Sequence, residues 1–341
     1  MVDLSKNKNS DDIIKRLFEA KGLGVVEPPI IPVSGGFMHK MYKVCAGGKC
    51  YAVKHLNREI MKRPEARKNY EKAEKLESIL EENKIPIIPA ISINNTKMFE
   101  LEGEYFYIFN WQEGSVTDWN AITLEQCRKA GSIQGRIHAI DSHSSGRVEQ
   151  ETESIDFSTM IEKAKAQNSE IFQALNENVS LLEYALEQMN SARKCLPGIE
   201  CIIDEDMDPK NVMWLNDEPV VIDLECLDYG NPVSSAIQLS LQWAGITTCS
   251  LDIQKMKAFF KGYLGAYDNG FDKYTEVFGL AYTWVEWLEF NIERALGNCV
   301  DENERQLGIS EVNNTVARIK YIREVEDEVK YILKSIGGTV L

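Results

Sequence analysis

The segment from Asp206 to Asp223 constrains this chain more than any other part of its sequence. It opens with D-M-D-P-K-N, so that four residues separate Asp206 from Asn211, and Asp223 follows an apolar run twelve positions after Asn211. Apolar stretches at 199–203 and 212–215 flank the loop. This alternation predicts a strand, a loop, a strand, a turn and a third strand, with the polar side chains confined to the connections.

Three oxygen-bearing side chains in this order suit phosphoryl transfer. The reaction needs a group that orients or deprotonates a hydroxyl, and it needs oxygen ligands for Mg²⁺, a hard cation that prefers carboxylate and amide oxygens. Asp206 is the candidate for the first role, and Asn211 and Asp223 are candidates for the second. Alone, the stretch Asp208–Asn211 also reads as an ordinary polar turn, so the kinase interpretation depends on the rest of the chain.

The N-terminal part supplies a lysine of the kind that holds nucleotide phosphates. Lys54 ends an apolar strand, and a second strand and a glycine turn precede it, which together predict a hairpin. Before the hairpin come Ser34, Gly35 and Gly36, where backbone N–H groups could approach phosphates closely, although a Gly-Gly pair is also common in plain turns. The order of glycine turn, hairpin and terminal lysine supports a nucleotide site.

A helix is predicted after the lysine strand, over Pro64–Asn83, with Pro64 near its start and an apolar stripe along it. Glu71 and Glu74 on this helix are both candidates to hold Lys54, and the sequence does not separate them. A further strand at 105–109 leads into a predicted hinge, whose backbone would meet the adenine: Asn110, Trp111 and Gln112.

The second half reads as mostly helical. Its helices are expected at Thr123–Ile140, at Asp156–Met189 as a pair or one broken helix, and at Ser234–Gly245, Asp252–Ala266, Tyr274–Leu296 and Asn313–Ser335.

Taken together, these segments resemble the aminoglycoside phosphotransferase and choline kinase superfamily of small-molecule kinases, from about Val33 to Gln242. The resemblance is carried by Ser34-Gly35-Gly36-Phe37, Val53-Lys54, Trp111–Gly114, Asp204–Asn211, Ile222–Glu225 and Gly230-Asn231-Pro232. It implies an α+β, bilobal, protein-kinase-like fold: a small β-rich lobe over 1–109 that binds the nucleotide, a hinge over 110–114, and a larger, mostly helical lobe over 115–341.

The resemblance also implies roles for single residues. Asp206 would be the catalytic aspartate, Lys54 the phosphate lysine, and Asn211 and Asp223 the metal ligands, with Glu225 assisting the metal. The implied cofactors are ATP, with GTP possible, and Mg²⁺.

Three positions depart from the family pattern. Asp204 and Glu205 stand where histidine and glycine are usual, and Ser235 lies where an aspartate is usual. An ionised carboxylate cannot donate the hydrogen bonds that a histidine would supply. Asp204, Glu205, Asp206 and Asp208 also crowd four acids into five positions, which raises their pKa values unless a cation neutralises them. A catalytically weakened relative that acts as a binding protein therefore stays an alternative.

The substrate expected from the resemblance is a small hydroxyl-bearing molecule, such as an aminoglycoside. The net charge of the chain is −15, and residues 196–341 carry 12 Lys or Arg against 25 Asp or Glu. This balance argues against nucleic acid and favours a cationic substrate, although excess acid also keeps a protein soluble. The candidates to contact the substrate are Asp208, Glu286, Glu289 and Glu293. A choline, ethanolamine or sugar kinase is the alternative within the family.

The sequence predicts no membrane partner. No apolar run approaches the roughly 18 residues of a spanning helix, and Met1–Lys6 lacks the apolar core of a signal peptide, so a cytoplasmic location is expected. The eight cysteines are scattered without a C-x-x-C pair and are expected to be free thiols. Cys45 and Cys50 could approach across the hairpin, but free thiols are favoured there too.

Overall fold

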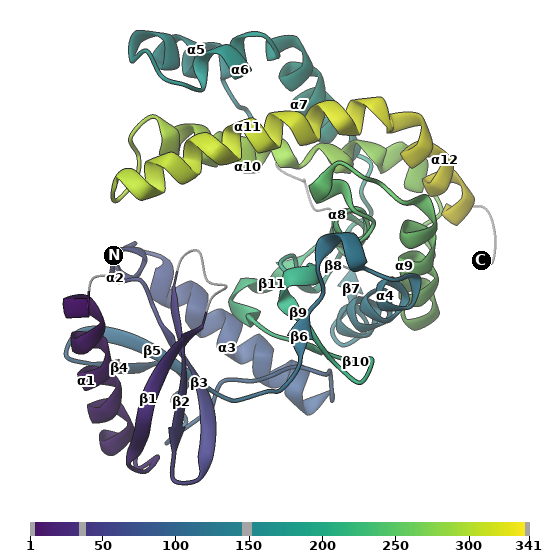
Figure 1. Ribbon diagram of the computed structural model, residues 1–341. Coiled ribbons are helices and arrows are strands. Elements are labelled where there is room, and N and C mark those ends of the chain that lie inside the picture. The colour runs from purple at the N-terminus through teal and green to yellow at the C-terminus, as the bar shows by residue number, and fades with distance from the viewer. Residues whose placement is uncertain (1–3, 34–38, 145–151, 338–341) are drawn as a thin grey trace. The chain divides into compact units, whose positions relative to one another are not determined.

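In the computed structural model, which describes residues 4–33, 39–144 and 152–337, the chain forms two compact units (Figure 1). The first unit comprises Met1–Ser115 and Val220–Glu225, and the second comprises Val116–Pro219 and Cys226–Leu341. The chain therefore leaves the first unit once and returns to it for one short segment. The mixed architecture, with a β-sheet in the N-terminal unit and mostly helices in the other, confirms the predicted fold class.

The first unit is built on a five-stranded antiparallel sheet in the order β1-β2-β3-β5-β4. Its elements are α1 (Leu4–Ala20), β1 (Val26–Val33), β2 (Lys40–Ala46), β3 (Lys49–His55), α2 (Arg58–Met61), α3 (Ala66–Glu82), β4 (Phe99–Leu101) and β5 (Glu104–Asn110). The predicted hairpin is confirmed as β2–β3, whose turn residues Gly47 and Gly48 both have positive φ, as a tight hairpin turn requires. The predicted helix after Lys54 is confirmed as α3.

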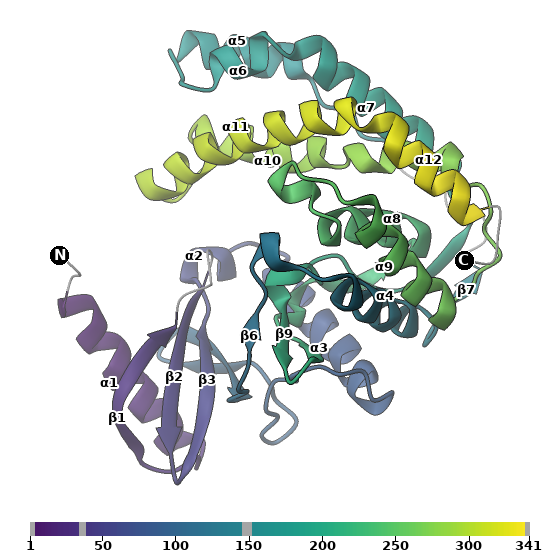
Figure 2. The same ribbon diagram turned by 45° about the vertical axis from the view of Figure 1, so that its right-hand side comes forward.

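The two faces of this sheet are covered by different elements, because side chains alternate along each strand. Tyr51 and Val53 of β3 point to one face and belong to a cluster that includes Leu17 and Phe18 of α1. Helix α1 lies beside the sheet in Figure 2. Lys54 points to the other face, where α3 supplies Tyr70. The alternation thus brings the predicted phosphate lysine to the α3 side of the sheet.

A disulfide joins Cys45 and Cys50, so the expectation that these two thiols stay free is wrong. They are directly opposite each other in the β2–β3 register, with Cα atoms 4.0 Å apart. The register of the hairpin, which places the two cysteines in the same cross-strand pair, decides this pairing. The other six cysteines are not in disulfides; two of them, Cys127 and Cys201, are buried.

The second unit is mostly helical. Its helices are α4 (Leu124–His138), α5 (Phe157–Ala166), α6 (Phe172–Asn176), α7 (Val179–Arg193), α8 (Pro232–Trp243), α9 (Ile253–Ala266), α10 (Trp284–Ala295), α11 (Glu302–Glu324) and α12 (Glu326–Gly337), with 3₁₀ turns η1 (Trp119–Ala121), η2 (Pro209–Asn211), η4 (Ile246–Thr248) and η5 (Tyr274–Tyr282). None of the helices in the described parts of the chain combines the length and apolar character needed to cross a bilayer.

Short strands complete the structure. They are β6 (Ser115–Val116), β7 (His143–Ser144), β8 (Ile199–Asp204), β9 (Val212–Leu215), β10 (Glu218–Val221) and β11 (Leu227–Gly230), with the 3₁₀ turn η3 (Leu224–Cys226). They form two small sheets, in the orders β10-β9-β6 and β11-β8-β7. The predicted run of strand, loop, strand, turn and strand from 199 to 223 is confirmed, and Asn216 and Asp217, both with positive φ, make its turn.

Most predicted helices lie where the apolar spacing placed them, and three differ. The segment expected at Asp156–Met189 as a pair or one broken helix forms three helices, α5, α6 and α7. The helix expected at Tyr274–Leu296 is the 3₁₀ segment η5, which is kinked at Val277, followed by α10. The helix expected from Asn313 begins eleven residues earlier, at Glu302, with Asp301 as its N-cap, and it ends before α12. Residues 302–306 are all polar, so the apolar pattern did not reveal this start.

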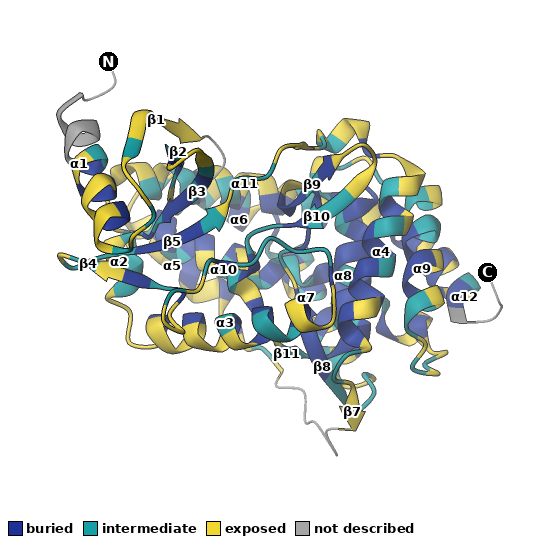
Figure 3. Ribbon diagram, turned by 90° about the horizontal axis from the view of Figure 1, so that it is seen from below, coloured by how far each residue is buried: buried dark blue, intermediate teal, exposed yellow. Residues whose placement is uncertain are grey.

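Helix α8 runs through the interior of the second unit and is buried along most of its length (Figure 3). Asn231 caps its first turn by accepting hydrogen bonds from the backbone N–H groups of Val233 and Ser234. Helices α4 and α9 pack together closely through glycines. A Cβ added at Gly262 would overlap with the carbonyl oxygen of Arg128, so only glycine allows this approach.

This close approach generates a stability prediction. We expect Gly262→Ala to lower the free energy of unfolding by roughly 1–3 kcal/mol, since the helices must move apart to admit the methyl group. Gly265→Ala, on the same helix, is the matched control, because its Cβ would meet no atom within 4 Å and should leave stability unchanged or raised by about 0.4–1 kcal/mol. Urea denaturation followed by circular dichroism measures both. Equal stabilities of the two variants would contradict the packing explanation.

Candidate active site

Lys54 lies buried against two carboxylates in the first unit. Its ammonium Nζ is 2.6 Å from Oδ1 of Asp223 and 2.5 Å from Oε2 of Glu225, and its side chain is 8% exposed. Burial disfavours the charged ammonium, but the two carboxylates outweigh this cost and raise the pKa of Lys54. The lysine is therefore held as a fixed cation, the form that can bind phosphate.

The segment that carries Asp223 is tied to the first unit by its backbone. Val221 donates its N–H to the carbonyl of Pro86 and accepts from the N–H of Ile88. Two residues later, Asp223 has a φ of 62°, in the left-handed region, which costs energy for every residue except glycine, although aspartate adopts it more readily than most. Such backbone strain persists where a side chain must point in one direction, and it is common at functional sites.

Glu225 is oriented by His39 and Tyr70, two residues that belong to no sequence motif. The ring nitrogen Nδ1 of His39 accepts the backbone N–H of Asn57, so the proton of a neutral His39 is on Nε2. That nitrogen lies 3.5 Å from Oε1 of Glu225 and 3.2 Å from the hydroxyl of Tyr70. The Tyr70 hydroxyl in turn donates to Oε2 of Glu225 at 3.5 Å. His39 and Tyr70 thus fix the carboxylate that holds Lys54.

The expectation that Glu71 or Glu74 holds Lys54 is wrong. Glu71 is exposed, and Glu74 accepts a hydrogen bond from the hydroxyl of Tyr107 at 2.7 Å. Glu225 is the glutamate that pairs with Lys54, and α3 contributes Tyr70 to this network. The partner comes from 171 residues further along the chain, so no local pattern on α3 could identify it.

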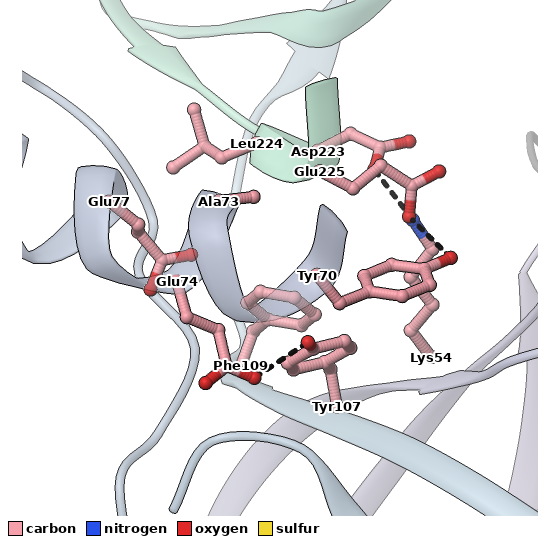
Figure 4. A pocket seen from close by; sticks show the side chains of 10 residues that line it. All are labelled: Lys54, Tyr70, Ala73, Glu74, Glu77, Tyr107, Phe109, Asp223, Leu224 and Glu225. Atoms are coloured by element: carbon pink, nitrogen blue, oxygen red, sulfur yellow. Dashed lines mark hydrogen bonds and ion pairs between the residues drawn. The ribbon is translucent and has the colours of Figure 1, made fainter. Parts of the chain in front are cut away.

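A small pocket opens beside this ion pair within the first unit (Figure 4). It is lined by Lys54, Tyr70, Ala73, Glu74, Glu77, Tyr107, Phe109, Asp223, Leu224 and Glu225. Glu77 forms a buried ion pair with Lys97 at 2.6 Å and accepts the N–H of Ala90. Burial raises the pKa of Glu77, despite this pairing. Through these bonds Glu77 ties α3 to the segment that carries Ala90 and Lys97, between α3 and β4.

The predicted hinge continues the sheet. Trp111 donates its backbone N–H to the carbonyl of Cys50 at 3.0 Å, and Lys43 lies over its ring at 4.1 Å from the centroid. Gln112 donates to the carbonyl of Glu113, and Asn110 is exposed at the end of β5. Ser34, Gly35 and Gly36, the expected phosphate loop, lie outside the described residues.

In the second unit, Asp206 lies in the loop between β8 and η2. The side-chain amide Nδ2 of Asn211 donates to the backbone oxygen of Asp206 at 2.8 Å and to its carboxylate Oδ2 at 2.9 Å. Because the Nδ2 hydrogens are used in this way, the Oδ1 of Asn211 remains as the atom that could bind a cation. The structure thus brings Asp206 and Asn211 together.

One positively charged side chain, that of Lys210, lies among the acids around Asp206. The ammonium of Lys210 lies 2.7 Å from Oδ1 of Asp206 and 2.8 Å from Oδ2 of Asp208. Burial raises the pKa of Asp208 to about 6 even though Lys210 opposes this shift. Burial also opposes the charge on Lys210, but the two carboxylates prevail and raise its pKa, so Lys210 stays protonated.

Two departures from the family pattern have local explanations. Asp204, in place of histidine, accepts the backbone N–H of Asp206 through Oδ1 at 3.2 Å, so it braces the loop as an acceptor. Ser235, in place of an aspartate, is fully buried and accepts a hydrogen bond from Gln134 at 2.9 Å. Both positions are integrated into the fold of the second unit.

The acids of α10 face other charged groups. Glu286 accepts from Arg193 at 2.6 Å, and Glu293 lies 3.9 Å from Lys163. Desolvation and the neighbouring charges of Glu153, Glu293 and Glu286 raise the pKa of Glu289. These acids form one electronegative area of the second unit, with Trp287 40% exposed next to them in sequence.

Two groups of functional candidates thus exist, one in each unit. The structure brings together Lys54, Asp223 and Glu225 in the first unit, and Asp206, Asp208 and Asn211 in the second. Each unit offers an oxygen donor of the type that Mg²⁺ prefers, the carboxylate of Asp223 in the first and the amide oxygen of Asn211 in the second. Among the described residues, no three acidic, histidine or cysteine side chains gather closely enough to hold an ion by themselves. A nucleotide-borne Mg²⁺ with one or two protein ligands fits this donor set.

Comparison with known proteins identifies the family. A family model described as the phosphotransferase enzyme family matches residues 29–276. The chain belongs to this family. The resemblance stated from the sequence is confirmed, and the protein is a small-molecule phosphotransferase. No curated protein is similar enough in sequence to count as a relative of this phosphotransferase.

Solved structures share the fold of this phosphotransferase at low sequence identity. A spectinomycin phosphotransferase in complex with ADP and spectinomycin has a TM-score of 0.65 and 14% identity, covering 91% of this chain and 97% of that one. An amicoumacin kinase with AMP-PNP and Ca²⁺ has a TM-score of 0.58 and 12% identity, with coverages of 93% and 96%. Choline kinase from Cryptosporidium parvum Iowa II has a TM-score of 0.56 and 13% identity, with coverages of 95% and 99%.

The network around Lys54 predicts a pH dependence of stability. Burial disfavours the ionised form of Glu225, but the hydrogen bond with His39 and the charge of Lys54 outweigh it and lower the pKa of Glu225 from 4.5 to about 2. Because the folded-state pKa is the lower one, Glu225 stabilises the fold above about pH 4.5, and this stabilisation is lost as the pH falls toward 2.

We therefore expect Glu225→Gln to reduce the steepness with which the free energy of unfolding falls between about pH 5 and about pH 3. Urea denaturation at several pH values measures this slope. Glu100→Gln is the control, since Glu100 is an exposed glutamate of the same sheet, paired with Arg67. If both variants keep the wild-type slope, Glu225 is not ionised in the way the network implies.

Proposed function

We propose that this phosphotransferase is a kinase that transfers the γ-phosphate of ATP to a hydroxyl group of a small cationic molecule. The observation that carries the proposal is the buried pairing of Lys54 with Asp223, whose backbone is strained. A lysine on a strand of the N-terminal sheet, beside an acid that follows a later strand, is the pair with which kinases hold phosphates and Mg²⁺. We propose ATP rather than GTP as the phosphate donor, because the spectinomycin and amicoumacin enzymes hold adenine nucleotides.

In this mechanism, Asp206 accepts a hydrogen bond from the acceptor hydroxyl and orients its oxygen toward the γ-phosphorus. The Lys54 ammonium gives up part of its contact with the carboxylates in order to bind the phosphates. Its remaining contact with Glu225 keeps it in place. Asn211 and Asp223 are the proposed metal ligands, with Glu225 assisting, and Mg²⁺ would neutralise charge that develops on the phosphates. Catalysis would depend on positioning and electrostatics, as phosphoryl transfer generally does.

The substrate class is argued from the acids of the second unit. Asp208, Glu286, Glu289 and Glu293 are the proposed contacts. Burial first, and then the nearby carboxylates of Glu153, Glu293 and Glu286, raise the pKa of Glu289. A cation that binds there would relieve the repulsion among these carboxylates. An aminoglycoside is one such substrate, and an amino alcohol such as choline or ethanolamine is the alternative.

A binding protein without turnover is the second candidate, because Asp204 and Glu205 replace the usual histidine and glycine. The hydrogen bond from the Asp206 N–H to Asp204 favours the enzyme, since the loop is braced in spite of the replacement. Binding of MgATP by the wild type, with no transfer to any hydroxyl compound, would support the binding protein instead.

The central test is an ADP-release assay across aminoglycosides, amino alcohols and sugars. We expect Asp206→Asn to lower kcat by about 10²–10⁴-fold, the usual contribution of a positioned base, while MgATP binding is retained. Asp217→Asn makes the same chemical change in an exposed turn and should keep full activity. Comparable turnover of Asp206→Asn and the wild type would reject the role of Asp206.

A second test addresses Lys54. We expect Lys54→Met to weaken MgATP binding by at least about tenfold, since hydrogen bonds to charged groups contribute about 1.5–3 kcal/mol. Lys62→Met, at an exposed lysine of the same unit that pairs with Glu59, is the control and should bind normally. Isothermal titration calorimetry measures both affinities. Unchanged affinity of the Lys54 variant would remove the phosphate role from this residue.

A further inference from the structure

We propose that Lys210 is a further catalytic residue, whose ammonium contacts the γ-phosphoryl group as it is transferred. This inference rests on the proposed function, in which Asp206 receives the acceptor hydroxyl. Lys210 is the one lysine between Asp204 and Asn211. Its ammonium is bonded to the carboxylate of Asp206, the residue proposed to orient the attacking hydroxyl.

The backbone of Lys210 is fixed by its neighbour. Asp208 is the N-cap of η2, and its Oδ1 accepts the backbone N–H of Lys210 at 2.9 Å. From this anchored position the side chain reaches back, and Nζ lies between Asp206 and Asp208. The Asp208 side chain is 9% exposed, whereas that of Lys210 is 46% exposed. The ammonium is therefore held on its protein side and open to solvent on the other.

The number of donors leaves room for a ligand. An ammonium carries three N–H donors. Two of them are used by Asp206 and Asp208, and within the described residues the structure gives the third no protein acceptor. An anionic oxygen of a ligand near Asp206 could accept it without displacing either carboxylate.

The chemistry places such an oxygen within reach. In the transfer, the acceptor oxygen forms a bond to the γ-phosphorus, the bond from that phosphorus to the β–γ bridging oxygen breaks with its electron pair leaving on ADP, and the proton of the acceptor goes to Asp206. A hydroxyl bonded to Asp206 and in line with phosphorus puts the phosphoryl group within about 6 Å of the carboxylate. Nζ of Lys210, 2.7 Å from the same carboxylate, can then reach an equatorial phosphoryl oxygen.

A purely structural role is the competing explanation. Lys210 could serve only to neutralise Asp206 and the buried Asp208, in which case its loss would act through repulsion between these acids. The two explanations differ when Asp208 is made neutral. Asp208→Asn removes a negative charge that Lys210 would balance in a structural role. It does not change the negative charge of the phosphoryl group, which Lys210 would contact in a catalytic role.

The experiment compares the full chain with Lys210→Met, Lys210→Arg and the double variant Asp208→Asn/Lys210→Met. Calorimetry measures the affinity for MgADP alone and for MgADP with aluminium fluoride, which imitates the phosphoryl group in transfer. We expect Lys210→Met to bind MgADP within about twofold of the wild type and the aluminium fluoride complex about 100-fold more weakly, the effect of removing one transition-state contact. Lys210→Arg should recover part of this loss, and the double variant should recover none.

Several outcomes would overturn the inference. If Lys210→Met binds the aluminium fluoride complex as the wild type does, or if Asp208→Asn restores that binding in the double variant, Lys210 only balances charge. The proposed function then stands without it. If the wild type binds no MgADP at all, the proposed function fails and this inference fails with it. Lys210→Arg keeps the positive charge that balances the two acids. If Lys210→Met does not fold, the affinity of Lys210→Arg for the aluminium fluoride complex is the measurement that tests the inference.

Discussion

The ammonium of Lys54, buried between Asp223 and Glu225, is the interaction on which the first unit depends. A buried ion pair is tolerated only when its geometry is good and its remaining groups are bonded, because removing charges from water is costly. Several elements meet this condition together. Strand β3 turns the lysine toward α3, Tyr70 and His39 fix Glu225, and the backbone bonds of Val221 hold the returning segment in place. The same arrangement keeps a positive charge ready for phosphate.

The loop around Asp206 contains more acidic side chains than basic ones, and its neighbours offset this negative charge. Lys210 supplies a positive charge inside the loop, and Asn211 bonds both the backbone and the carboxylate of Asp206. Asp204 completes the loop by accepting a backbone N–H. Asp204, which replaces the usual histidine, thus still supports the loop, through a bond two residues away. Both units present a carboxylate and a lysine in contact, the charge arrangement that phosphoryl transfer uses.

Local patterns predicted well those features that local forces determine. The strands at 199–223 and the β2–β3 hairpin follow from alternating apolar residues and turn residues, and α4 begins at the capping box of Thr123 and Gln126. Features that depend on long-range packing escaped prediction. Glu225 rather than Glu71 or Glu74 meets Lys54 because the chain returns to the first unit, and His39 and Tyr70 carry no motif. Lys210 was visible as a cation among acids, but only its bond to Asp206 reveals a use for it.

The return of Val220–Glu225 to the first unit has a consequence for how that unit can form. The counter-charges of Lys54 are 169 and 171 residues further along the chain, so during synthesis the sheet emerges long before its lysine can be neutralised. A fragment that ends at Ser115 would have to bury an ammonium alone or leave β3 open to water. We expect, therefore, that this sheet cannot be transplanted as one contiguous piece, and that it matures only after the ribosome has passed residue 225.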